Sequence, residues 1–145
     1  MADLHIEDFY RDVARIFLHL YNSFPRKIVL YVEDISGPDE PDEFGLHHPR
    51  FDACFSTMIW LGEQGYLSYD ATIGREALDQ AVLTRKSFLL LTSRSSLDPA
   101  AAVAADTAAP SIAATLGTNV TQLRAVLRSA SSIDIGRCVS YLLNL

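Results

Sequence analysis

The run WLGEQGYLSYDATIGREALDQAVLTRKSFLLL, residues 60–91, constrains the fold more than any other part of the chain. An apolar helix ends at Gly65, because glycine takes the left-handed conformation that closes a helix without steric cost. The alternating segment that follows, residues 66–73, predicts a strand, and Gly74 marks a turn into a returning strand. Thr84 is a favourable helix N-cap. The run therefore predicts a helix, a β-hairpin and a second helix, in that order.

Three further elements and a loop are expected before the hairpin. Apolar residues at three- and four-residue spacing predict a helix over residues 6–25, which a proline ends. A β-branched and aromatic run, residues 27–32, predicts a short strand. Six acids then fall between Glu33 and Glu43 among glycines and prolines, which is typical of a surface loop with at most one helical turn. Residues 50–65 predict the helix that leads into the hairpin.

The C-terminal part of the chain changes composition twice. Residues 95–111 are rich in alanine and contain prolines but no regular period, which predicts a linker. Residues 112–145 regain apolar periodicity and predict a helical hairpin, with Asn119 and Gln122 spaced as in a capping box. The sequence is therefore interpreted as an α+β domain over residues 1–94, followed by the linker and the helical hairpin.

The pattern around the β-hairpin resembles that of MarR- and PadR-type winged-helix regulators over about residues 51–92. A glycine and an aromatic–leucine step open the wing, and a leucine–threonine step with basic residues closes it. The residues that carry the resemblance are Gly65, Tyr66, Leu67, Leu83, Thr84, Arg85 and Lys86. The chain departs from the pattern at Ser87, where these regulators usually have glycine. The resemblance implies a winged helix-turn-helix-like fold with a β-hairpin wing, in which the helix before the wing binds DNA.

The charge pattern disfavours that use of the fold. Between Phe51 and Gly74 there is no lysine or arginine, although a DNA-reading helix needs side chains that reach phosphates. Residues 46–100 hold five cations and six acids, and the whole chain has a formal net charge of -6. A DNA-binding transcriptional regulator of winged-helix type is kept as the alternative function. Its contacts would come from Ser56, Thr57, Gln64 and Arg75.

We favour a non-enzymatic module that acts through protein–protein interaction and self-association. Trp60 falls between the polar face and the apolar stripe of its helix, and tryptophan is enriched at interface hot spots. We therefore expect Trp60, Phe44 and Tyr69 to form part of a surface for a protein partner whose identity the sequence does not give. The alternative is that Trp60 packs beneath the acidic loop or the C-terminal helices. A homodimer through the C-terminal helices is predicted from their apolar faces.

The arginines of the C-terminal helices have two interpretations. Arg124, Arg128 and Arg137 are spaced along helix faces, as solubilising residues are. They could equally form ion pairs with the acidic loop. In the second case, reversing the charge of Arg124 and Arg128 should weaken assembly at low salt.

No catalytic, metal or cofactor site is predicted. His47 and His48 lie in a loop near Cys54, but the HxxxH and HExxH spacings of metal sites are absent. Nearby loop acids that could have joined such a site are Asp39, Asp42 and Glu43. His19 and Cys54 fall beside or within apolar stripes, which indicates packed side chains rather than a base and a nucleophile. P-loop and GxGxxG motifs are absent as well.

The sequence also gives an expectation for the cellular compartment of the protein. The N-terminus lacks a basic segment followed by an apolar run, and no apolar stretch approaches the about 18 residues of a membrane span. Cys54 and Cys138 lie far apart and form no CxxC pair, which is typical of reduced thiols. The expectation is a cytoplasmic protein without membrane contact.

Overall fold

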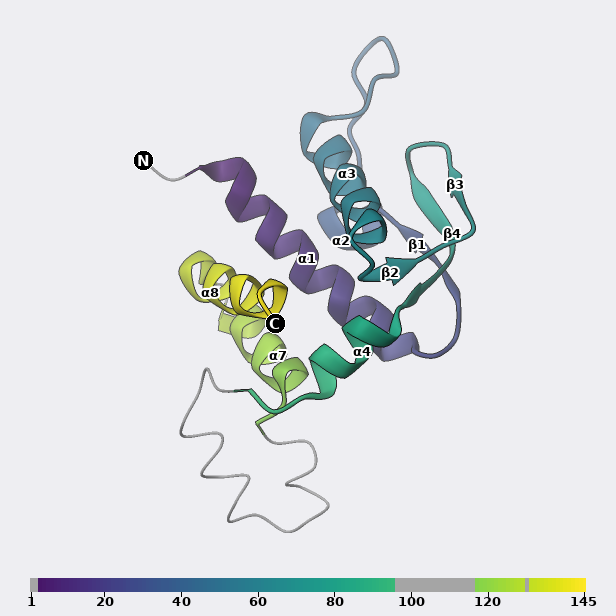
Figure 1. Cartoon of the computed structure of the whole chain (residues 1–145). Helices are drawn as coiled ribbons and strands as arrows, with labels where there is room; N and C mark the ends of the chain where they lie inside the picture. Colours follow the sequence, from purple (N-terminus) through teal and green to yellow (C-terminus); the bar gives the residue numbers. More distant parts are fainter. Residues whose placement is uncertain (1–2, 96–116, 130) are drawn as a thin grey trace.

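A computed structural model describes residues 3–95, 117–129 and 131–145 of the chain, and Figure 1 shows the path of the chain through it. The described part is α+β, as the sequence predicts. Its elements are α1 (Leu4–Ser23), β1 (Ile28–Tyr31), α2 (Glu33–Ser36), α3 (Pro49–Glu63), β2 (Leu67–Ser68), β3 (Ala71–Ile73), β4 (Ala77–Leu83), α4 (Arg85–Thr92), α7 (Asn119–Ser129) and α8 (Ser132–Leu143).

The described strands form one small antiparallel sheet with β4 at its centre. β1 lies on one side of β4, and β2 and β3 pair with β4 on the other. The prediction of one continuous strand over residues 66–73 is wrong, because the segment divides into β2 and β3. Gln80 of β4 has a positive φ of 56°, and the pairing with β1 shifts register between Ile28 and Leu30. This irregularity has the form of a β-bulge. It bends β4 opposite the break between β2 and β3.

The helix α1 runs through the middle of the molecule, between α3 and the sheet on one side and α7 and α8 on the other (Figure 1). Its stripe of Val13, Ile16, Phe17 and Leu20 is fully buried. The C-terminal helices pack on α1 within the same chain, and their apolar residues join the same core cluster as the residues of α1 and α3. Whether they form a domain of their own, as predicted, stays a prediction. All but the first residue of the predicted linker lie outside the described residues.

The helix caps next to the hairpin are confirmed. Gly65 follows α3 with a φ of 81°, in the left-handed conformation. The hydroxyl of Thr84 accepts a hydrogen bond from the amide of Ser87 at 3.4 Å and donates one to the carbonyl of Gly65 at 2.6 Å. The side chain of Ser87 is fully buried and donates to the carbonyl of Tyr66. The two ends of the hairpin are thus tied to each other by hydroxyl groups.

The capping box predicted at Asn119 is wrong. The side-chain amide of Asn119 is buried and donates to the carbonyl of Leu90 at 2.8 Å, so it joins α7 to α4. Thr118 has the capping role instead, because its hydroxyl accepts from the amide of Thr121 at 3.4 Å.

The single turn expected in the acidic segment is confirmed as α2. Among the described helices, none has the length and apolar character needed to cross a membrane.

Candidate functional site

An open hollow with a volume of about 480 Å³ lies between one face of α3 and the tip of the β-hairpin. The helix begins at Pro49, after an N-cap in which the His48 ring accepts from the amide of Arg50 at 3.1 Å. It buries one stripe in the core and turns the other side toward the hairpin. The residues that line the hollow are Phe55, Ser56, Ile59, Trp60, Glu63 and Arg75.

Trp60 is partly exposed in this hollow. Its side chain remains 37% accessible, while its ring meets Phe9 of α1 edge-on, with ring centroids 5.3 Å apart. On another side it stacks with Tyr66 at 6.3 Å. Trp60 is therefore held by α1 and by the residue that opens the wing. An aromatic ring that is anchored on some sides and open on another has the character of an interface hot spot.

The other two residues of the predicted partner surface lie at opposite ends of α3. Tyr69 is half-buried and lies against the backbone of Gly62, where a Cβ atom would be 2.9 Å from the Tyr69 ring. Phe44 is 78% exposed in the loop that precedes α3. The helix between Pro49 and Trp60 alone spans about 16 Å at 1.5 Å per residue. Within one copy, Trp60 and Tyr69 share the C-terminal end of α3, and Phe44 stands apart from both.

The residues of the DNA-binding alternative do not form a free polar face. Thr57 is buried, and its hydroxyl donates to the carbonyl of Ala53 at 3.0 Å. Ser56 lines the hollow, and Gln64 is exposed at the C-cap of α3. Arg75 reaches from the wing toward α3, where it meets groups of the protein itself.

The contacts of Arg75 are an ion pair and a ring. Its Nε lies 3.4 Å from Oδ1 of Asp52, and its guanidinium lies 5.3 Å from the centre of the Phe55 ring. Both partners belong to α3. The cation that the sequence places at the wing tip is therefore already bound to the helix that a DNA reader would insert into the groove.

A second ordered feature, which the sequence analysis missed, is the loop before α3. Oδ1 of Asp42 accepts hydrogen bonds from the amides of Phe44, at 2.9 Å, and Leu46, at 3.0 Å. Gly45 completes the turn with a φ of 76°. The turn holds the side chains of Phe44 and Leu46 outward, and Leu46 is 63% exposed. Aspartate two residues before a turn position is a known local signal, so this turn could have been found from the sequence.

The base of the same loop is tied down by Asp39 and His47. Their side chains form a hydrogen bond, and Asp39 also accepts from the amide of His48 at 2.9 Å. The His47 ring stacks on Phe51 of α3 with centroids 4.7 Å apart. The hydrogen bond to Asp39 raises the pKa of His47 above its usual value. Although burial alone would raise the pKa of Asp39, the hydrogen bonds from His47 and His48 lower it.

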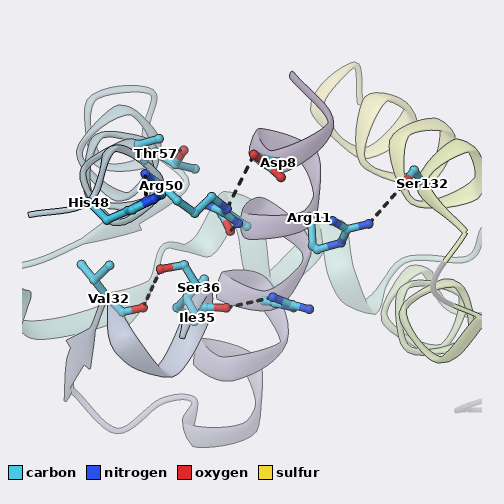
Figure 2. A network of polar contacts seen from close by, with 12 residues as sticks. Asp8, Arg11, Val32, Ile35, Ser36, His48, Arg50, Thr57 and Ser132 are labelled. Carbon is cyan, nitrogen blue, oxygen red and sulfur yellow. Dashed lines mark hydrogen bonds and ion pairs between the residues drawn. The ribbon is translucent and has the colours of Figure 1, made fainter. Parts of the chain in front are cut away.

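Arg50 joins α3 to α1, and Figure 2 shows its side chain extended toward Asp8. Asp8 lies 3.6 Å from Nε, and both oxygens of the buried Asp12 accept from the terminal nitrogens. Arg11 of α1 donates to the hydroxyl of Ser132 at the start of α8, at 3.1 Å (Figure 2). These arginines fasten helices to one another, so they are not available to an external ligand.

The chemistry expected of the remaining candidates is that of packed side chains. Burial raises the pKa of Cys54 to about 12 and that of Cys138 to about 11, so both thiols stay protonated and weakly nucleophilic. His47 and His48 do not gather with acids into a metal-binding group, and within the described residues no such group of three or more ligands occurs. His19 is half-buried on α1.

Comparisons of the chain with family models, with curated proteins and with solved structures found no match.

Proposed function

We propose that the chain is a non-enzymatic protein-interaction module of winged-helix-like topology that self-associates. The order of its elements supports that topology, since α1, β1 and α2 precede α3, and a hairpin and α4 follow it. The central place of β4, between β1 and the outer strands of the hairpin, supports it as well. α2 has a single turn, and residues 37–48 separate it from α3, whereas a helix-turn-helix uses a turn of about 3–4 residues.

The observation that carries the proposal is the surface beside α3. Where a DNA reader would present cations, this helix presents Trp60 at the rim of a hollow, and Arg75 is bound to Asp52 and Phe55. Specific DNA binding draws much of its affinity from cations that contact phosphates. A surface with an anchored aromatic ring and an arginine that is already paired suits a protein partner better than a polyanion.

The predicted homodimer through the C-terminal helices remains part of the proposal. Although α7 and α8 pack on α1, α8 still exposes Ile133 to 75% near its first turn. The proposal places this helix pair at or beside the contact between copies.

Two measurements test the proposal. Light scattering at micromolar concentration should give a mass above that of the monomer, and a monomeric mass would contradict self-association. Capture of a partner from the native host should fall by about 10-fold or more for Trp60→Ala, the loss expected at a hot spot. Ile73→Ala, which truncates an exposed apolar residue of the wing, is the matched control and should leave capture unchanged.

The DNA-binding alternative rests on the wing and on the exposed polar residues Ser56 and Gln64. A mobility-shift assay on random duplex DNA at several salt concentrations separates the two functions. Binding with a steep log–log dependence on salt, lost in Arg75→Ala, would favour the alternative. Absence of binding at low salt would exclude it.

A further inference from the structure

Three described segments that meet at one end of the molecule contain cations but no aspartate or glutamate. We call Arg26, Lys27, Arg85, Arg124 and Arg128 the cationic end. They come from the turn after α1, from the start of α4 and from α7. No acid occurs in residues 13–32, 80–95 or 117–129. In a chain with a formal net charge of -6, this is a strong local excess of positive charge.

The fold brings these three segments together. The rings of Phe24, after α1, and Phe88, in α4, stack with centroids 4.4 Å apart. Arg124 of α7 donates to the side chain of Asn22 at 3.2 Å, and its guanidinium lies 5.4 Å from the centre of the Tyr21 ring. The turn after α1 therefore meets α4, and the last turns of α1 meet α7.

The acidic loop lies at the other end of the molecule. Figure 1 shows the loop that precedes α3 projecting on one side, with α4 and α7 on the opposite side of α1. Glu40, Asp42 and Glu43 are all exposed in this loop. The hydrogen bonds of Asp42 and the Asp39–His47 pair fix its shape before any partner arrives. The two charged regions are too far apart to neutralise each other within one copy.

The two regions also match in their apolar residues. The acidic loop displays Phe44 and Leu46 directly after its acids. On the cationic end, Leu89 of α4 is exposed, one helical turn after Arg85 and on the same face. Each region therefore has exposed apolar side chains next to charged ones, and the charges of the two regions are opposite.

We propose that the acidic loop of one copy docks on the cationic end of a second copy, with Phe44 and Leu46 against Leu89. The inference rests on the self-association proposed above and names its contact. Two such contacts related by a two-fold axis close into an antiparallel dimer, and a single repeated contact makes an open chain. The arginines of α7 make the C-terminal helices part of the interface. Nucleic acid would use the cations alone and would leave the ordered acidic loop without a role.

The test is an exchange of charges between the two regions. The loop variant combines Glu40→Lys with Glu43→Lys, and the end variant combines Lys27→Glu with Arg85→Glu. All four positions are exposed, and circular dichroism with a urea titration verifies that each variant folds. Sedimentation velocity then measures association at about 50 mM salt, where surface charges are weakly screened.

Each variant alone should associate at least about 10-fold more weakly than the natural chain, because like charges then face each other. An equimolar mixture of the two should recover association, since the reversed loop of one copy meets the reversed end of the other. A control that combines Asp3→Lys with Asp70→Lys makes the same change in net charge as the loop variant at exposed positions outside both regions, and it should associate like the natural chain.

The other outcomes overturn the inference in distinguishable ways. Association that survives both reversals but is lost in Ile133→Ser would place the contact on α8, and the proposed self-association would stand. A natural chain that stays monomeric at every salt concentration would contradict both the proposed self-association and the proposed contact. Binding of random duplex DNA that is lost in the end variant, with no effect of the loop variant on association, would assign the cationic end to nucleic acid.

Discussion

The guanidinium of Arg50 holds the carboxylate of Asp12 by two hydrogen bonds, from Nη1 to Oδ2 at 2.6 Å and from Nη2 to Oδ1 at 2.5 Å. Asp12 is only 1% exposed, and the Arg50 guanidinium is the cation that it meets. The two residues are 38 positions apart in sequence, and their contact joins α3, which lines the hollow, to the central helix α1. Two-point pairing of this kind fixes direction as well as distance.

Removal of Arg50 should therefore be costly. Arg50→Met leaves the Asp12 carboxylate buried without a cation, and we expect a loss of about 3 kcal/mol in the free energy of unfolding. Replacing Asp12 by leucine in the same chain removes the orphaned charge and should restore much of the stability. Urea denaturation measures both effects. A double variant as unstable as the single one would show that the pair does not act as argued.

The two thiols should be unreactive in the folded protein. Burial raises the pKa of Cys54 to about 12 and that of Cys138 to about 11, so at pH 8 almost no thiolate is present. A colourimetric disulfide reagent should modify neither residue in the native chain and both after unfolding in urea. Rapid modification of a native thiol would mean that the core around it opens readily.

Features that depend on near neighbours in sequence were predictable. Gly65 and Thr84 close and open helices through backbone and hydroxyl contacts within a few residues, and both caps are as expected. The error at Asn119 has the opposite origin, because its amide meets Leu90, 29 residues earlier, and that contact outweighs the local capping pattern. The break between β2 and β3 likewise accompanies a bulge at Gln80 in a strand that pairs on both sides.

The candidate surfaces also contain some features that local sequence indicates and others that depend on long-range contacts. The position of Trp60 between the polar and apolar faces of its helix left two outcomes open, a partly exposed ring or a ring packed beneath the loop or the C-terminal helices, and the ring is 37% exposed. The binding of Arg75 by Asp52 and Phe55 requires knowing how the wing lies against α3. The cationic end was missed because its arginines and its lysine come from three distant segments. Only the packing of α7 on α1 and α4, together with the stack of Phe24 on Phe88, makes them neighbours.

The base of the acidic loop should respond to pH. Because Asp39 raises the pKa of His47, the pair stabilises the loop fully below the usual histidine value of 6.5, and this contribution is lost as pH rises through the raised pKa. Because the pKa of Asp39 is lowered from 3.8, its contribution is present above that value and is lost as pH falls through the lowered pKa. The loop should be best anchored between these limits. Other acids that face His47 are Glu33, Asp52 and Glu76.

Nuclear magnetic resonance measures the pH dependence of the Asp39–His47 pair directly. The ring protons of His47 should titrate above pH 6.5, and amide exchange of the loop, corrected for its intrinsic pH dependence, should accelerate over the same range. In Asp39→Asn the His47 titration should move to lower pH, because the charged acceptor is gone. An unchanged titration in that variant would show that the two side chains do not interact in solution.

The tip of the loop should depend on one acceptor atom. Asp42→Ala removes the oxygen that binds the amides of Phe44 and Leu46, so both amides should exchange faster, by about 5-fold or more if the net contribution of the hydrogen bonds is about 1 kcal/mol. Asp42→Asn keeps an oxygen in the same place and should retain most of the protection, although it loses the charge. The pair of variants thus separates the shape of the tip from its charge. If Asp42→Asn exchanged as fast as Asp42→Ala, the carboxylate charge rather than the turn geometry would hold Phe44 outward.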